Sequence, residues 1–351
     1  MAQYISFQPS DNFGSKLYSG NGSTQSITGF GFQPDIVWVK KTNGSPVENW
    51  GAFSSPRGVT KYLHQNNTDA EATNANSLTS FDADGFSLGL AGFSNGSGAD
   101  QISWCWKGGT TSGITTNGST DITPSSYSFN QTAGISVVKF TGNGTSGATI
   151  AHGLGAIPEM VLVKNLTGGG AQSWNMYHIA MGNTKWLDIN GNSAPGTDVS
   201  RWNNTTPDSV NFTVGDAGSV NTSGGTHVAY CFKNTTGFSK MGKYKGNGQN
   251  DGQFTYLGFR PKLFIARSID NSDRQWMVFS STKGVNGSLG IGYLDSSEVF
   301  TSGSVQHHLL SNGYKAKTSA SSVNGSNESY LYMAFAEFPF VASNSDPGTA
   351  R

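Results

Sequence analysis

Paired carboxylates are the first chemistry to look for, because a glycosidase needs two of them about 5–10 Å apart across a cleft. In this sequence of 351 residues the glutamates are scattered and form no recurring pair: Glu48, Glu71, Glu159, Glu298, Glu328 and Glu337. The sequence also lacks a Gly-x-Ser-x-Gly elbow that would hold an activated nucleophile. We therefore predict a non-enzymatic protein with no catalytic residues.

Three short patterns could bind an ion or react as thiols. Asp82-Ala83-Asp84-Gly85 resembles the start of a calcium loop, but the later ligands and the closing Glu are absent, so a turn is the better interpretation. We expect His307-His308 to be a polar surface feature. Cys105 and Cys231 occupy equivalent places in two copies of a repeat, which indicates buried thiols rather than a disulfide or zinc ligands. We predict no metal and no cofactor.

Three cationic residues each end an apolar run: Lys40, Lys164 and Arg267. A charged residue in this position usually marks the point where a strand leaves the core, and that is our expectation here. Binding of an anionic ligand is the alternative.

Aromatic residues could stack on sugar rings. Trp50, Trp174 and Trp276 recur once per copy of the repeat, which favours core packing over a glycan platform. Aromatic residues that do not recur are better candidates for a specific contact: Trp202, Tyr293 and Tyr314.

Lys40, Lys164 and Arg267 each end a signature that occurs three times, roughly a hundred residues apart, and the recurring tryptophans follow it. Its first part is Gly-Asn-Gly after an aromatic residue, and its second part is Gly-x-x-Pro before an apolar run. The glycines are Gly20 and Gly22, Gly142 and Gly144, and Gly246 and Gly248, and the prolines are Pro34, Pro158 and Pro261. Each copy ends in an aromatic strand, such as Trp104-Cys105-Trp106.

The signature predicts how each copy is built. Gly and Asn tolerate positive φ, so Gly-Asn-Gly predicts a tight hairpin turn between a strand and its return. Each proline is expected just before a strand, where its missing N–H costs least. The apolar runs, such as Ile36-Val37-Trp38-Val39, predict a central strand covered on both faces.

The composition favours strands. Charged residues make up only 13% of the chain, there are 47 glycines, and aromatic residues reach 12%, enough for a core in each copy. β-Branched and aromatic residues gather in short runs bounded by Gly, Asn, Asp and Pro. We predict an all-β protein of three tandem β-sandwich domains, with a jelly roll as one option, from an internal triplication.

The expected boundaries follow from the copies. Residues 1–109 hold an N-terminal segment and repeat 1, residues 110–126 a flexible Gly/Ser/Thr linker, residues 127–238 repeat 2, residues 239–342 repeat 3, and residues 343–351 a loose tail. The linker predicts that repeats 1 and 2 tilt relative to each other, while repeats 2 and 3 form a stiffer pair.

Charge and hydropathy limit the classes of partner that the protein can have. The formal net charge is zero, with 22 basic and 22 acidic residues and no basic run, which disfavours binding to nucleic acid. No apolar run approaches the roughly 20 residues of a membrane span, and the first residues lack the pattern of a signal peptide. We expect no membrane insertion and a protein that is made and folded without a secretory signal of its own.

Several longer stretches resemble tandem-repeat virion proteins, structural or tail-fibre-like, of marine tailed bacteriophages. They include Tyr4-Ile5-Ser6-Phe7-Gln8-Pro9-Ser10-Asp11, Ser80-Phe81-Asp82-Ala83-Asp84-Gly85-Phe86 and Trp104-Cys105-Trp106-Lys107-Gly108-Gly109. The resemblance covers the first two copies almost fully and the third more weakly. It implies a phage virion protein and carries no catalytic residues.

From this resemblance we expect a virion structural protein, first of all a tail fibre or tail appendage that contacts the host cell surface. A capsid decoration or head-fibre protein is the alternative, and a polysaccharide-cleaving tail spike is a further one. The expected location is the tail or the capsid exterior. The expected partners are other virion proteins and a host surface glycan or outer-membrane protein.

Two questions stay open at the level of sequence. Residues Met1 to Lys16 are either a segment that attaches the protein to the particle or the first strand of repeat 1. The chain either forms a homotrimer or imitates one through its three copies.

Overall fold

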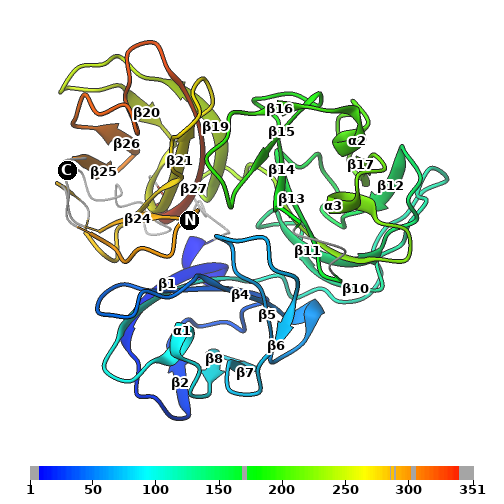
Figure 1. Ribbon diagram of the computed structural model, residues 1–351, viewed down its shortest axis with the longest axis horizontal. Helices are drawn as coiled ribbons and strands as arrows, with labels where there is room; N and C mark the ends of the chain where they lie inside the picture. The colour runs from blue at the N-terminus through cyan, green and yellow to red at the C-terminus, as the bar shows by residue number, and fades with distance from the viewer. Residues whose placement is uncertain (1–7, 168–171, 285, 288–289, 302–305, 340–351) are drawn as a thin grey trace, which may run out of the picture.

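The computed structural model describes residues 8–167, 172–284, 286–287, 290–301 and 306–339. It is nearly all β, as predicted, and has three lobes arranged around a common centre (Figure 1). Each lobe contains one copy of the signature and pairs a larger antiparallel sheet with a smaller one. The residues of the predicted loose tail, 343–351, lie outside the described residues.

Repeat 1 forms a four-stranded sheet and a three-stranded sheet. The larger sheet has the order β1 (Phe13–Ser19), β9 (Asp100–Trp106), β3 (Ile36–Lys41) and β4 (Gly51–Ser54), and the smaller has β2 (Gln25–Thr28), β8 (Gly85–Leu88) and β7 (Leu78–Asp82). Short elements complete the lobe: η1 (Pro9–Asp11), η2 (Ser55–Arg57), β5 (Lys61–Tyr62), β6 (Ala72–Thr73) and α1 (Gly92–Asn95).

Repeat 2 has the largest sheet. Its order is β10 (Ser126–Asn130), β11 (Ile135–Thr141), β18 (Thr226–Phe232), β13 (Met160–Asn165), β14 (Asn175–His178), β15 (Lys185–Asp188) and β16 (Gly196–Thr197). The smaller sheet pairs β12 (Ala148–Ala151) with β17 (Asn211–Val214), and the lobe also contains α2 (Val199–Trp202) and α3 (Gly218–Asn221).

Repeat 3 is built in the same way. Its larger sheet has the order β19 (Ser239–Lys245), β27 (Ser329–Pro339), β21 (Phe259–Ser268), β22 (Met277–Ser280) and β24 (Ile291–Tyr293). Its smaller sheet has β20 (Phe254–Tyr256), β26 (Gly313–Ala316), β25 (His307–Leu310) and β23 (Asn286–Gly287).

Four strands therefore recur in the same order in every larger sheet: the strand before Gly-Asn-Gly, the closing strand, the strand of the apolar run (the signature strand) and the strand after the recurring tryptophan. The strand before Gly-Asn-Gly does not pair with the strand after it, which lies in the smaller sheet. The expected hairpin is thus wrong, because the turn carries the chain from one sheet of the sandwich to the other. In repeat 3, Pro261 lies inside β21 at a bulge rather than before the strand.

The signature strands are buried on both faces, as predicted. In β3, Val37 and Val39 pack against the smaller sheet of their own repeat, whereas Ile36 and Trp38 face the centre of the molecule. Residues alternate between faces along a strand, so each larger sheet contributes to two cores at once.

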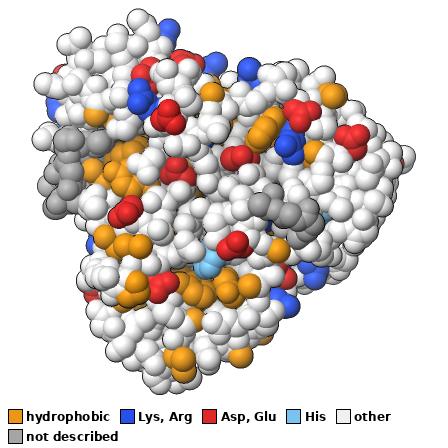
Figure 2. Space-filling model, viewed as in Figure 1, with side chains coloured by type: hydrophobic (Ala, Val, Ile, Leu, Met, Phe, Trp, Pro, Cys, Tyr) orange, Lys and Arg blue, Asp and Glu red, His pale blue; other side chains and the backbone are white. Residues whose placement is uncertain are grey.

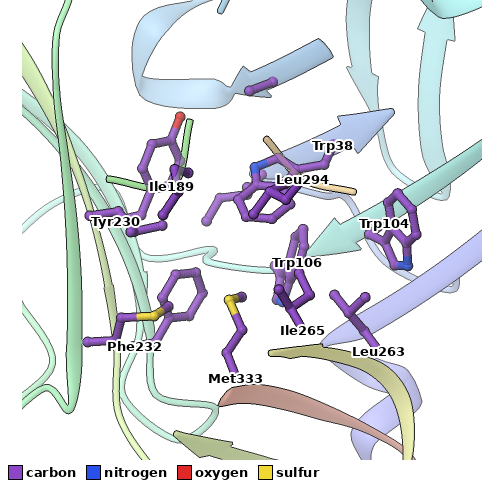
Figure 3. Packing of buried hydrophobic residues seen from close by; sticks show 14 of the residues in the cluster. Trp38, Trp104, Trp106, Ile189, Tyr230, Phe232, Leu263, Ile265, Leu294 and Met333 are labelled. Carbon is purple, nitrogen blue, oxygen red and sulfur yellow. The ribbon is translucent and has the colours of Figure 1, made fainter. Parts of the chain in front are cut away.

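The central core is shared by all three repeats (Figure 3). It contains six of the eight tryptophans: Trp38, Trp50, Trp104, Trp106, Trp174 and Trp276. The closing strands bring aromatic rings together there, with the ring centroids of Trp106 and Phe335 5.4 Å apart and those of Phe232 and Phe335 5.6 Å apart. The repeats are therefore not free to tilt, because such a motion would expose this apolar interior.

Two connecting regions differ from expectation. In residues 110–126, the Ile122 N–H donates to the Thr149 carbonyl at 2.9 Å, and the Ile122 side chain packs in the core of repeat 2. The segment is thus an ordered part of repeat 2 rather than a free linker. At the N-terminus, Phe13 is buried in the central core as part of β1, so residues 13–16 belong to the fold. Residues 1–7 lie outside the described residues.

Candidate functional site

The two glycines of each Gly-Asn-Gly turn serve different purposes. The second glycine has a positive φ in every copy: +64° at Gly22, +69° at Gly144 and +67° at Gly248. The first glycine allows a close approach of backbone, because a Cβ on Gly20 would lie 2.2 Å from the Gly96 carbonyl oxygen. The corresponding carbonyl lies 2.4 Å from such a Cβ on Gly142 and 2.3 Å from one on Gly246.

A buried asparagine holds each turn, and sequence reasoning missed it. The Asn221 side chain donates to the carbonyls of Thr145 at 2.9 Å and Gly215 at 3.0 Å, and it accepts the Asn143 N–H at 2.9 Å. Asn95 and Asn324 make the equivalent bonds in repeats 1 and 3. The available signal was an Asn at a fixed distance before each closing strand.

The recurring tryptophans join the repeats in a ring. Their indole N–H groups donate to backbone carbonyls of another repeat: Trp50 to Tyr293 of repeat 3, Trp174 to His64 of repeat 1, and Trp276 to Asp188 of repeat 2, each at 2.9 Å. All three tryptophans are buried, and none presents a face for sugar stacking. We call each of these three contact zones between repeats a seam.

The cations at the ends of the signature strands strengthen the same seams. Lys40 Nζ donates to the Ser297 carbonyl of repeat 3 at 2.9 Å, and Lys164 Nζ to the Thr68 carbonyl of repeat 1 at 3.0 Å. Arg267 Nη1 donates to the Gly191 carbonyl of repeat 2 at 2.9 Å. All three side chains are fully buried. The expectation that they leave the core is thus wrong, and an anionic ligand could not reach them.

Burial lowers the pKa of all three cations. Desolvation lowers the pKa of Lys40 and of Lys164 to about 8, and that of Arg267 to about 10. The hydrogen bonds to carbonyls supply what water would otherwise provide to a buried cation.

Repeat 3 carries an unusual acid at its seam. In each repeat the backbone N–H of the recurring tryptophan donates to a side-chain oxygen. The acceptor is Asn66 in repeat 1, Asn190 in repeat 2 and Asp295 in repeat 3. Burial raises the pKa of the Asp295 carboxyl to about 6, against the opposing effects of the Trp276 N–H and of Arg267. The seam at Trp276 therefore contains a carboxyl group whose pKa lies nearer to neutral than that of an ordinary Asp.

Most other candidates from the sequence are packed residues. Trp202 and Tyr314 lie in the cores of repeats 2 and 3, so they are not surface contacts. His307 is buried against the Phe279 ring, with centroids 4.3 Å apart, and is not a surface feature. Cys105 and Cys231 are free and buried. Asp82 to Gly85 form the turn between β7 and β8.

The described residues hold no group of three or more His, Cys, Asp or Glu side chains placed to bind a metal. In the same part of the chain every α-helix is a single turn, and none could cross a membrane. On the face drawn in Figure 2 most of the surface is uncharged, with acidic and basic side chains scattered over it.

The described residues of repeat 3 border three surface hollows, and a fourth of about 410 Å³ lies beside β1 of repeat 1. One, of about 310 Å³, is bordered by Tyr293, Arg274 and Ser321, which makes Tyr293 the sequence candidate that does reach the surface. A second, of about 420 Å³, includes Asp251 and Lys317. A third, of about 460 Å³, opens between β19 and β20. Repeat 3 also carries ten of the 22 basic residues.

Residues 8–339 match a family model described as a domain of unknown function, DUF7483. The chain belongs to this family. One family model spans all three repeats, so the unit that defines the family is the closed three-repeat body rather than a single repeat. A comparison with curated proteins finds no match.

Proposed function

We propose that this chain is a non-enzymatic structural protein of a bacteriophage virion, and that it acts as a tail fibre or tail appendage contacting the host cell surface. The observation that carries the proposal is the closed ring of three repeats around one core. A single chain of this kind imitates a trimer, and it can occupy a threefold position in a larger assembly without further copies.

Two other features support the proposal. The sequence resembles tandem-repeat phage virion proteins over long stretches of repeats 1 and 2. The seams use buried hydrogen bonds and apolar packing rather than exposed ion pairs, so the body is suited to saline surroundings in which surface charges are screened. Its partners would be other virion proteins and a glycan or protein of the host surface.

A capsid decoration protein is the second candidate. The pseudo-threefold body favours it as well, because the described residues form no elongated shaft and the three lobes lie around one axis (Figure 1). Both candidates place the protein on the outside of the particle after assembly in the host cytoplasm.

Electron microscopy of intact virions labelled with an antibody against this chain tests the proposal. Label at the tail is the expected result, and label spread over the head would favour the decoration protein. Virions that carry no label, although antibody binds the purified protein, would contradict both. Virions lacking the gene product provide the control for non-specific labelling.

A further inference from the structure

The hollow of about 310 Å³ in repeat 3 lies at a place that side chains fill in the other two repeats. Ser322 borders it, and the equivalent residues are Phe93 in repeat 1 and Ser219 in repeat 2, since each stands two positions before the buried asparagine of its repeat. Tyr293 also borders it and corresponds to His64, because the carbonyls of both accept the indole N–H of a recurring tryptophan. The three repeats can therefore be compared at this place.

Repeats 1 and 2 fill the place in different ways. In repeat 1 the Phe93 ring packs against His64, with ring centroids 5.3 Å apart. In repeat 2 the Arg201 guanidinium donates to the Ser219 hydroxyl and lies over the Trp186 ring, 4.5 Å from its centroid. In repeat 3 a serine takes the place of Phe93, and the hollow lies beside it.

One side of the hollow is apolar and is lined by Tyr293 and Met277. Tyr293 is half-buried and packs against the core of repeat 3, to which Met277 belongs. Aromatic rings pack well against flat nonpolar surfaces, and the C–H groups of a pyranose form such a surface. This side of the hollow is therefore suited to one face of a sugar ring.

Arg274 is the principal polar group of the hollow. Its Nη2 donates to Glu328 Oε1 at 3.4 Å, and its buried Nε–H has no acceptor among the described residues. The Ser268 hydroxyl donates to Glu328 Oε2 at 3.0 Å, so the carboxylate that orients Arg274 is itself held in place. The guanidinium thus keeps donors for an acceptor group in the hollow.

The rest of the rim is mostly polar and consists of Asp273, Gln275, Ala320, Ser321 and Ser322. Its carboxylate, amide and hydroxyl groups offer both donors and acceptors, which suits a sugar hydroxyl because that group donates one hydrogen bond and accepts others. Glu328 offsets the charge of Arg274, and Asp273 adds a negative charge at the rim. An acidic ligand would therefore find no excess of positive charge here.

The walls of the hollow are fixed by hydrogen bonds to the other two repeats. The Tyr293 carbonyl accepts the Trp50 indole N–H of repeat 1 at 2.9 Å. The Asp273 N–H donates to the Asn192 carbonyl of repeat 2 at 2.9 Å. Binding between walls that are already ordered costs less conformational entropy than binding that must order them.

We propose that this hollow of repeat 3 binds one unit of a neutral glycan, with a pyranose ring against Tyr293 and Met277 and its hydroxyl groups bonded to Arg274 and Asp273. This inference rests on the proposed contact with the host surface, for which it supplies a ligand class. Small-molecule sites in proteins measure about 300–1,000 Å³, so a hollow of about 310 Å³ suits a single sugar unit.

A side chain of another protein fits less well, although repeats 1 and 2 fill the place with a ring and a guanidinium group. A phenyl ring would leave the donors of Arg274 unpaired, and a second guanidinium would be repelled by the first. A sugar unit offers an apolar face and hydroxyl groups at once, which matches both sides of the hollow.

Ligand-observed NMR on the full chain tests the inference with six probes. Three are neutral, namely methyl mannopyranoside, methyl galactopyranoside and methyl glucopyranoside. The others are glucuronate and two blocked amino acids, N-acetylphenylalaninamide and N-acetylargininamide. We expect at least one neutral glycoside to bind with a dissociation constant of about 1 mM or below, and the other three probes to bind at least about tenfold more weakly.

Two variants locate the binding. Ser322→Phe installs the ring that repeat 1 has at this place, and Arg274→Lys keeps a charge beside Glu328 but loses the planar set of donors. Each should weaken binding of the neutral glycoside about tenfold or more. Tyr256→Ala is the control, since Tyr256 is an exposed ring of repeat 3 that lies outside the described lining of this hollow, and its affinity should equal that of the parent protein. Unchanged thermal unfolding shows that each variant is folded.

The inference is overturned if no neutral glycoside binds, if glucuronate binds equally well, or if the Tyr256 control loses as much affinity as the two variants. Tighter binding of either blocked amino acid would identify a docking pocket for another protein instead. Virion labelling is independent of these measurements. A labelled virion protein that binds no neutral glycoside would refute this inference alone, whereas glycoside binding by a chain absent from virions would refute the proposed function alone.

Discussion

Asp295 gives the sharpest test of how the seams are stabilised. The substitution Asp295→Asn installs the residue type that repeats 1 and 2 have at the equivalent place, Asn66 and Asn190. An amide oxygen can still accept the Trp276 N–H, which lies 3.1 Å from the carboxylate oxygen. The substitution therefore removes the charge and keeps the hydrogen bond.

The magnitude follows from the pKa. Burial raises the pKa of Asp295 from 3.8 to about 6, which disfavours the ionised form in the folded state by up to about 3 kcal/mol. Between these two values the folded state binds more protons than the unfolded state, so this group lowers stability as the pH rises through the window. Asn carries no such penalty. We expect Asp295→Asn to raise the free energy of unfolding by up to about 3 kcal/mol above pH 6 and to change it little below pH 3.8.

Urea unfolding followed by tryptophan fluorescence measures this effect, because most tryptophans lie in the central core. Asp216→Asn is the control, since Asp216 is exposed and its substitution should change stability by no more than about 0.5 kcal/mol at any pH. If Asp295→Asn lowers stability at neutral pH, attraction between the carboxylate and Arg267 outweighs the cost of burial, and the reasoning is refuted.

Three further predictions concern the fold. Residues 110–238 expressed alone should aggregate or bind a hydrophobic dye, because the central face of repeat 2 would be exposed; a soluble, cooperatively unfolding fragment would contradict this. Asn221→Ala should lower the free energy of unfolding by about 3 kcal/mol or more in urea, since two carbonyls lose their buried donor, and a loss below about 1 kcal/mol would count against it. Gly142→Ala should lower the melting temperature more than Gly144→Ala, because only the first forces a Cβ against backbone; the reverse order would refute that assignment.

The sequence predicted well what depends on local chemistry. Ile36 to Val39 are apolar at consecutive positions, and such a run requires burial on two faces whatever the partners are. The second glycine of each turn could likewise be assigned, because the need for positive φ is local.

The sequence did not show which residues cover the second face of each signature strand. A consecutive apolar run indicates burial on both faces, but it does not identify the residues that pack against either face. The same limit misled the interpretation of Lys40. A lysine after an apolar run usually reaches solvent, but one of the carbonyls that accept from Lys40 is that of Ser297, in the last repeat.

The direction of the seams has a further consequence. Every repeat offers a donor side, with its tryptophan and cation, and an acceptor side made of backbone carbonyls. Such head-to-tail contacts would extend without limit if the rotation between units failed to close. Here the contacts close after three units, so no donor or acceptor side of a repeat remains free to add a fourth repeat in the same way.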